Sequence, residues 1–280
     1  MSLNAERIAC STITLRHLPL EQALATITSL GFEVIDLGAL PGVCDHVPYV
    51  LDEAAVEQVA ATVNASGLAV RSINADVGDL NAVLDDEALA ARERHVRRLL
   101  DLAVAIGSDA IVLPNGRQSH DAVESFEADL DRIVEQLTWV DGLARARGVE
   151  LWVEAPHFFR FLWNEERSAA LYERLPETVG AVCDVSHIVA SEGTPRAFLD
   201  RFAGRTRHVH LRDAEKGYIH HSIGNGQVDF ADLAASLTEH GYEGVLALEL
   251  ETRDVEDDDR PAAALAAGEL VSELLAAVRA

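Results

Sequence analysis

The chain has 280 residues and a formal charge of −24, and 49% of its residues are apolar and 25% charged. This length suits one large α/β domain, and the composition is that of an ordered globular protein rather than a disordered one. The negative charge disfavours binding to nucleic-acid phosphates and to anionic membranes, so a small molecule is the expected ligand.

The N-terminal segment "MSLNAERIAC" has no basic stretch followed by an apolar one, and the chain contains no run of about 18 apolar residues. We therefore expect a cytoplasmic protein without membrane or nucleic-acid partners. Three cysteines, Cys10, Cys44 and Cys183, show no CxxC spacing. They predict small buried side chains rather than disulfides or a zinc knuckle.

Short β-type segments alternate along the chain with longer segments in which apolar residues recur every three or four positions, as in "LEQALATITSLG". The eight predicted strands span residues 7–11, 33–37, 69–73, 109–113, 150–154, 180–184, 206–210 and 245–249. Glycines such as Gly31 and Gly107 follow the helical segments, where a left-handed residue commonly ends a helix.

Eight such units predict an α/β fold, a single-domain (β/α)₈ TIM barrel over residues 1–280, closed by a final helix within 260–278. The alternative is an open, doubly wound sheet. That fold places a glycine-rich phosphate turn after its first strand, whereas "TITLRHLPL" follows the first strand here and contains no glycine.

In a TIM barrel the active site lies at the C-terminal ends of the strands. Strands five to eight end in Glu154, Asp184, His210 and Glu249. Each residue alone is also explained by a salt bridge or a strand-end cap. Three carboxylates around one axis, however, repel one another unless protons or a cation neutralise them. We therefore expect these four residues to bind one divalent metal ion.

Neighbouring residues leave some choices open. His208 and His210 share one face of a strand, and His210 lies closer to the barrel mouth, so His208 is expected to be a packed residue. Glu249 and Glu251 also share a face, and Glu249 ends the apolar run. His187 follows Asp184 by three positions and is expected to reach the metal or a substrate oxygen, unless it is an exposed loop residue.

The ligand set is rich in carboxylate oxygen, which favours hard divalent cations. Mn²⁺ is the expected cofactor, with Mg²⁺, Co²⁺ and Zn²⁺ as alternatives.

The segments "WVEAP", "CDVSH", "HVHLRD", "SIGNGQVDF" and "YEGVLALELE", in this order, resemble the sugar phosphate isomerase/epimerase family of xylose isomerase-like TIM barrels, which also includes type IV apurinic endonucleases. The resemblance covers nearly the whole chain. It implies that Glu154, Asp184, His210 and Glu249 hold one metal ion and that the two glutamates act as catalytic acid and base. It also implies a homodimer, since barrels of this group commonly pair.

By the same resemblance, His187 and a basic residue after strand seven hold substrate oxygens. Lys216 stands where ketose 3-epimerases of this family have an arginine, and Arg160 stands where they have a further glutamate. We expect both to bind substrate, although a lysine lacks the two-pronged grip of an arginine. These two departures leave the particular sugar open.

The expected activity is isomerisation or epimerisation of a sugar or keto-polyol by proton transfer through a metal-stabilised enediolate. A metal-dependent dehydratase or lyase acting on a keto-polyol or a cyclitol is the alternative. A noncatalytic barrel and a DNA-repair nuclease are further alternatives; the nucleases of this group use several zinc ions, and the acidity of the chain disfavours a DNA partner.

Overall fold

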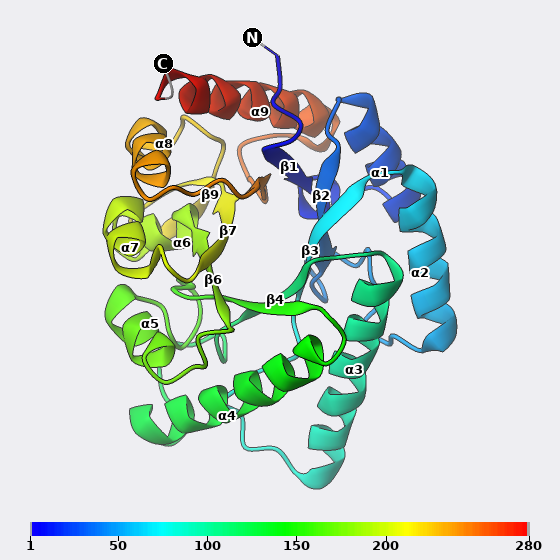
Figure 1. The fold of residues 1–280 in the computed structure, drawn as a ribbon, viewed down its shortest axis with the longest axis vertical. Coiled ribbons are helices and arrows are strands. Elements are labelled where there is room, and N and C mark those ends of the chain that lie inside the picture. Colours follow the sequence, from blue (N-terminus) through cyan, green and yellow to red (C-terminus); the bar gives the residue numbers. More distant parts are fainter. Residues whose placement is uncertain (1, 279–280) are drawn as a thin grey trace.

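The computed structural model describes residues 2–278 as a closed barrel of eight parallel strands surrounded by helices (Figure 1). Around the barrel the strand order is β1-β10-β7-β6-β5-β4-β3-β2. Strands that follow one another in the barrel are therefore neighbours, and the first closes against the last. The predicted (β/α)₈ TIM barrel is confirmed. The expected domain limits, residues 1 and 280, lie outside the described residues.

All eight barrel strands lie within two residues of the predicted segments. They are β1 (Ile8–Ser11), β2 (Val34–Ala39), β3 (Ala69–Ala75), β4 (Ala110–Pro114), β5 (Glu150–Glu154), β6 (Gly180–Asp184), β7 (Thr206–Leu211) and β10 (Leu246–Leu248). A small antiparallel hairpin, β8 (Asp213–Glu215) and β9 (Tyr218–His221), follows β7. The sequence pattern does not predict this hairpin, because its strands are too short to show an alternation of apolar and polar residues.

The helices cover the outside of the barrel. They are α1 (Leu20–Ser29), α2 (Glu53–Ser66), α3 (Asp86–Ala105), α4 (Phe126–Arg145), α5 (Glu165–Tyr172), α6 (Val185–Ala190), α7 (Pro195–Phe202), α8 (Phe230–Glu239) and α9 (Arg260–Ala277), with 3₁₀ turns at Thr12–Leu15 and Asp257–Asp259. The side chains of Asp52, Asp85 and Ser125 cap the starts of α2, α3 and α4 by accepting backbone N–H bonds. Helix α9 lies beside β1 and α8 (Figure 1).

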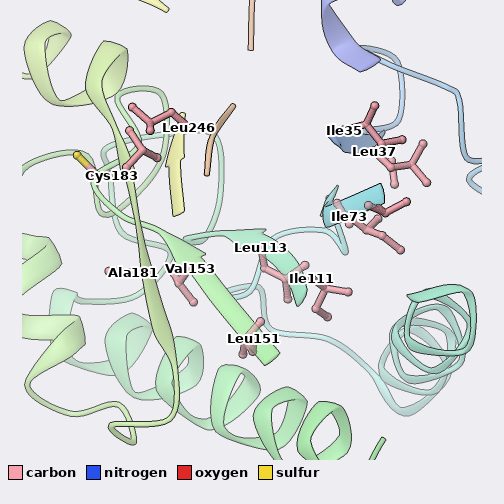
Figure 2. Packing of buried hydrophobic residues seen from close by; sticks show 14 of the residues in the cluster. Ile35, Leu37, Ile73, Ile111, Leu113, Leu151, Val153, Ala181, Cys183 and Leu246 are labelled. Carbon is pink, nitrogen blue, oxygen red and sulfur yellow. The ribbon is translucent and has the colours of Figure 1, made fainter. Parts of the chain in front are cut away.

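Side chains alternate across each strand, so every strand has an outer row that faces the helices and an inner row that faces the barrel axis. The outer row forms the large apolar core; among its residues in Figure 2 are Ile35, Leu37, Ile73, Leu113 and Val153. A separate, small apolar cluster fills part of the barrel interior and consists of Ala110, Val112, Trp152 and Val182. The remaining inner positions include several polar residues, which brings them together inside the barrel.

The three cysteines are buried free thiols, as predicted. Between residues 2 and 278, no helix is both long and apolar enough to cross a membrane.

Candidate metal centre and active site

Four acidic and histidine side chains meet where strands β5, β6, β7 and β10 end. One ligand atom from each of Glu154, Asp184, His210 and Glu249 lies within 4.8 Å of the others. All four residues are buried, with His210 fully inaccessible and Glu154 only 5% exposed. Glu249 directly follows the last residue of β10, whereas the other three lie within their strands. The structure thus brings the four sequence-predicted residues into one cluster, which we call the four-residue cluster.

The imidazole of His210 is at the centre of this cluster. Its Nδ1 atom lies 3.3 Å from Glu154 Oε2. The same atom lies 3.8 Å from both Asp184 Oδ2 and Glu249 Oε2. One nitrogen therefore faces three carboxylates from the ends of three other strands. The four groups converge as potential metal ligands.

Asp184 uses its two carboxylate oxygens differently. Oδ1 caps the start of α6 and accepts hydrogen bonds from the backbone N–H of Ser186 at 2.8 Å, its hydroxyl at 2.6 Å and the N–H of His187 at 3.0 Å. Oδ2 is buried and has no hydrogen-bond partner among the described residues. A buried oxygen of this kind is costly unless a proton or a cation satisfies it. The local fold thus holds the carboxylate rigidly and leaves one oxygen for a ligand.

Two further side chains fix Glu249. Asn74, in β3, donates a hydrogen bond of 2.7 Å from Nδ2 to Glu249 Oε1. Arg212, which is 2% exposed, has its NH2 group 3.8 Å from Glu249 Oε2 and 3.0 Å from the hydroxyl of Ser186. The guanidinium group therefore brings one permanent positive charge to the edge of the cluster.

The pKa values of the cluster residues are shifted because the cluster has more buried carboxylates than nearby positive charges. Burial, together with the neighbouring Glu154 and Asp184, raises the pKa of Glu249 to about 8. Burial also raises the pKa of Glu154. Burial alone would lower the pKa of His210, but the carboxylates of Glu249, Glu154 and Asp36 outweigh it and raise that pKa to about 10. Without a metal ion the cluster therefore retains protons near neutral pH. A divalent cation would replace them.

Two stacked histidines border Glu154 on the other side. His187 accepts a hydrogen bond of 3.0 Å at Nδ1 from the backbone N–H of Phe158. Its Nε2 atom lies 3.4 Å from Glu154 Oε1. The ring of His157 stacks on that of His187 with centroids 3.8 Å apart, and its Nε2 is 3.5 Å from the same oxygen. Burial lowers the pKa of both histidines well below the usual value. His187 is therefore neutral at pH 7 and carries its proton on Nε2, facing the cluster.

The other two predicted substrate-binding residues lie in different surroundings. Arg160, in the same loop as His157, is 5% exposed and donates hydrogen bonds to Asp76 Oδ2 at 2.6 Å and to the Gly116 carbonyl at 2.7 Å. Lys216 lies on the turn between β8 and β9, and its side chain is 71% exposed and paired with Glu192 at 2.9 Å. The structure does not bring the Lys216 ammonium group to the four-residue cluster.

Sequence reasoning did not single out two residues near the cluster, His157 and Asp36. His157 belongs to the loop after β5, and only the folded loop places it against His187. Asp36 is a fully buried carboxylate inside β2. Its sequence context, "EVIDL", contains a signal, because a carboxylate flanked by two apolar residues in a barrel strand must face the interior.

Comparison with known proteins agrees with the fold. A family model described as the xylose isomerase-like TIM barrel matches residues 24–273. No curated protein matches the chain in sequence.

Several solved structures share the architecture at low sequence identity. The IolI protein with a bound zinc atom has a TM-score of 0.78 and 15% identity, over 97% of this chain and 99% of that one. A D-tagatose 3-epimerase-like protein has a TM-score of 0.78 and 19% identity, over 98% of both chains. An L-ribulose 3-epimerase has a TM-score of 0.77 and 21% identity, over 100% of this chain and 96% of that one. At these identities the similarity concerns the fold.

Proposed function

The chain belongs to the xylose isomerase-like TIM barrel family, and from that premise we propose that it is a divalent-metal-dependent enzyme that isomerises or epimerises a sugar or keto-polyol. The observation that carries this proposal is the four-residue cluster: three carboxylates and one imidazole from the ends of four strands converge within 4.8 Å of one another, and Asp184 Oδ2 has no hydrogen-bond partner among the described residues. The solved epimerases that share the fold support the substrate class.

The residues present fit a metal ion. The unpartnered Oδ2 of Asp184 and the Nδ1 of His210 are buried donors, and Glu154 Oε2 and Glu249 Oε2 face the same point. Three oxygen donors and one nitrogen donor suit Mn²⁺, which is the cofactor we propose; Mg²⁺, Co²⁺ and Zn²⁺ accept similar donors. When bound, a divalent ion supplies a Lewis acid that makes a proton next to a substrate carbonyl easier to remove.

Glu154 and Glu249 are the proposed acid and base. Glu154 directs Oε2 to His210 and Oε1 to the two neutral histidines, and we assign the proton transfer to Oε1, beside the proposed substrate-binding His187. Glu249 is fixed by Asn74 at Oε1 and by its position beside Arg212. One glutamate removes the proton and the same or the facing one returns it. General acid–base catalysis by such groups contributes about 10²- to 10⁴-fold in rate.

Substrate oxygens are proposed to bind next to these carboxylates. The Nε2–H of His187 is a fixed donor because Phe158 occupies its other nitrogen. Arg160 is also proposed to bind a substrate oxygen, through a guanidinium group that its ion pair with Asp76 holds in place. A contact between Lys216 and substrate stays a prediction that requires the β8–β9 hairpin to move its ammonium group away from Glu192.

Incubation of the purified protein with Mn²⁺ in D₂O, with a panel of ketoses, aldoses and cyclitols, tests the proposal. Deuterium uptake at carbon with interconversion of isomers and no loss of water supports it. A new absorbance from a conjugated carbonyl supports the dehydratase alternative instead. The same incubation with the Glu249→Gln variant is the negative control. A reaction that persists in this variant contradicts the assigned site.

Two other expectations stay predictions. A homodimer would sediment at about twice the chain mass of 30.3 kDa in analytical ultracentrifugation. A cytoplasmic location would place the protein in the cytosolic fraction of its own cells.

A further inference from the structure

Asp36 is a carboxylate buried one layer below the four-residue cluster. It is fully inaccessible and lies in β2 between Ile35 and Leu37, whose side chains point outward into the helix-facing core (Figure 2). Its Oδ1 accepts a hydrogen bond of 2.5 Å from the hydroxyl of Ser72, its neighbour in β3. Its Oδ2 has no hydrogen-bond partner among residues 2–278. A carboxylate in such a place needs a role, because desolvation is costly.

The atom that faces the unpartnered oxygen is the far nitrogen of His210. His210 Nε2 lies 3.7 Å from Asp36 Oδ2, and this nitrogen likewise lacks a hydrogen-bond partner within the described part of the chain. Both residues are fully buried, so water does not satisfy either atom from bulk solvent. The two orphaned atoms therefore complement one another as donor and acceptor, at a separation slightly beyond hydrogen-bond distance.

The protonation of His210 follows from the other end of the ring. A histidine binds a metal through an unprotonated nitrogen, so Nδ1, which faces the three carboxylates of the cluster, must carry the lone pair. The proton of the neutral ring then lies on Nε2. Asp36 is the acceptor toward which Nε2 points.

Resting on the proposed metal centre, we propose that Asp36 is a positioning residue that accepts the Nε2 proton of His210, fixes the tautomer and orientation of the ring, and strengthens Nδ1 as a metal ligand. A carboxylate behind a ligating histidine raises the basicity of the ligand and removes the freedom of the ring to rotate. The hydroxyl of Ser72 holds the other oxygen, so the carboxylate itself is held in place.

A second metal ion held by Asp36, His208 and His210 is the rival explanation, because donor atoms of these three also lie within 4.8 Å of one another. That site would bind through both nitrogens of His210 at once and would require an imidazolate. His208 Nε2 is 3.4 Å from the Ser72 hydroxyl, and its ring packs against Trp152 with centroids 5.3 Å apart. These contacts favour a packed, neutral His208.

The test compares Asp36→Asn with Asp129→Asn, a change at a fully buried carboxylate that hydrogen-bonds to Arg132 and not to the cluster. Titration with Mn²⁺ is expected to show one ion per chain in the wild type. Asp36→Asn is expected to weaken that affinity about 10- to 100-fold, whereas Asp129→Asn leaves it unchanged within about twofold. An Asp36→Asn variant that folds and binds with wild-type affinity overturns the inference, and so does a wild type that binds two ions of which this variant loses one.

A second measurement does not depend on a variant that folds. In ¹⁵N-labelled wild type loaded with diamagnetic Zn²⁺, the His210 ring is expected to show a proton on Nε2, shifted downfield and protected from exchange by a carboxylate acceptor. A ring protonated on Nδ1, or an Nε2 proton that exchanges freely, overturns the inference. A wild type that binds no ion at the four-residue cluster refutes both the proposed function and the role of Asp36. If Asp184→Ala loses the ion and Asp36→Asn binds it as the wild type does, only the role of Asp36 is refuted.

Discussion

Asp129 and the carboxylates of the four-residue cluster form two sets of buried carboxylates, the first with a single member. The sets differ in how many hydrogen-bond donors and positive charges the chain supplies to them. Asp129, in α4, is fully buried and accepts hydrogen bonds of 2.7 Å from Asn81 and from the Arg132 guanidinium. It also accepts the backbone N–H groups of Val123 at 2.7 Å and Glu124 at 3.1 Å. Burial alone would raise the pKa of Asp129, but these four donors outweigh it and lower that pKa.

The carboxylates of the four-residue cluster are in the opposite condition. Glu154, Asp184 and Glu249 share one imidazole and the edge of one guanidinium, and burial raises the pKa of Glu154 and Glu249. Asp129 is a buried charge that the chain satisfies by itself, whereas the cluster is where we propose that a cation binds. Burial of a carboxylate does not by itself suggest a metal centre; several carboxylates around one imidazole, with an unpartnered oxygen on Asp184, do.

The largest expected difference between the two sets is in catalysis. Glu249→Gln and Glu154→Gln keep the shape of the site and remove an acid or base, so we expect kcat to fall by about 10²- to 10⁴-fold. Asp129→Asn should keep kcat within about threefold of the wild type. Steady-state kinetics with the substrate found in the D₂O screen measures both. Equal losses in the three variants would mean that the cluster acts only through stability.

Metal affinity should separate the sets next. Asp184→Ala removes a buried cluster carboxylate oxygen that has no hydrogen-bond partner within residues 2–278. We expect the Mn²⁺ affinity to fall by more than about 100-fold, because loss of a metal ligand costs more than loss of a residue that hydrogen-bonds to a ligand. Isothermal titration and metal analysis measure this. Unchanged affinity in Asp184→Ala would remove the cluster from consideration as the binding site.

The pH dependence of metal binding sharpens the same contrast. His210, with a pKa of about 10, and Glu249, with a pKa of about 8, both retain protons below pH 8 in the metal-free protein. A cation must displace them, so affinity should rise with pH, by about tenfold per pH unit for each displaced proton. Titrations at pH 6, 7 and 8 check the slope. An affinity that is flat over this range would show that no proton leaves the cluster.

The smallest expected effect is on the stability of the metal-free protein, and its sign should differ between the sets. Asp129→Asn removes a charge that the chain has fully paired, so we expect a loss of about 1–3 kcal/mol in the free energy of unfolding. Glu249→Gln replaces a carboxyl group whose pKa of about 8 leaves it largely protonated at neutral pH with a neutral amide of similar shape, so its stability should equal or exceed that of the wild type. Urea denaturation in EDTA measures both. A large loss in Glu249→Gln would mean that the cluster is complete without a cation.

The fold and the positions of the four cluster residues are largely predictable because each depends on a local pattern. The bounds of β5 and β6 coincide with the predicted segments, since an apolar run ends at a single carboxylate in each. Glu249 ends its apolar run in the same way, although regular pairing in β10 stops one residue earlier, at Leu248.

The surroundings of the site are less predictable because they depend on which loops meet. Lys216 follows His210 by six positions, but an unpredicted hairpin turns its side chain to the surface. The Asn74–Glu249 hydrogen bond joins residues 175 positions apart. The apolar neighbours of Asp36 in the sequence indicate that its side chain faces the barrel interior. They do not indicate that His210 lies opposite it. Long-range pairing of this kind is set by closure of the barrel.

Anomalous diffraction from crystals soaked in Mn²⁺ shows directly whether the four-residue cluster binds the ion. We expect one anomalous peak per chain, about 2.2 Å from Glu154, Asp184, His210 Nδ1 and Glu249. No peak among these four residues at saturating Mn²⁺, or a peak held only by Asp36 and His208, would contradict it.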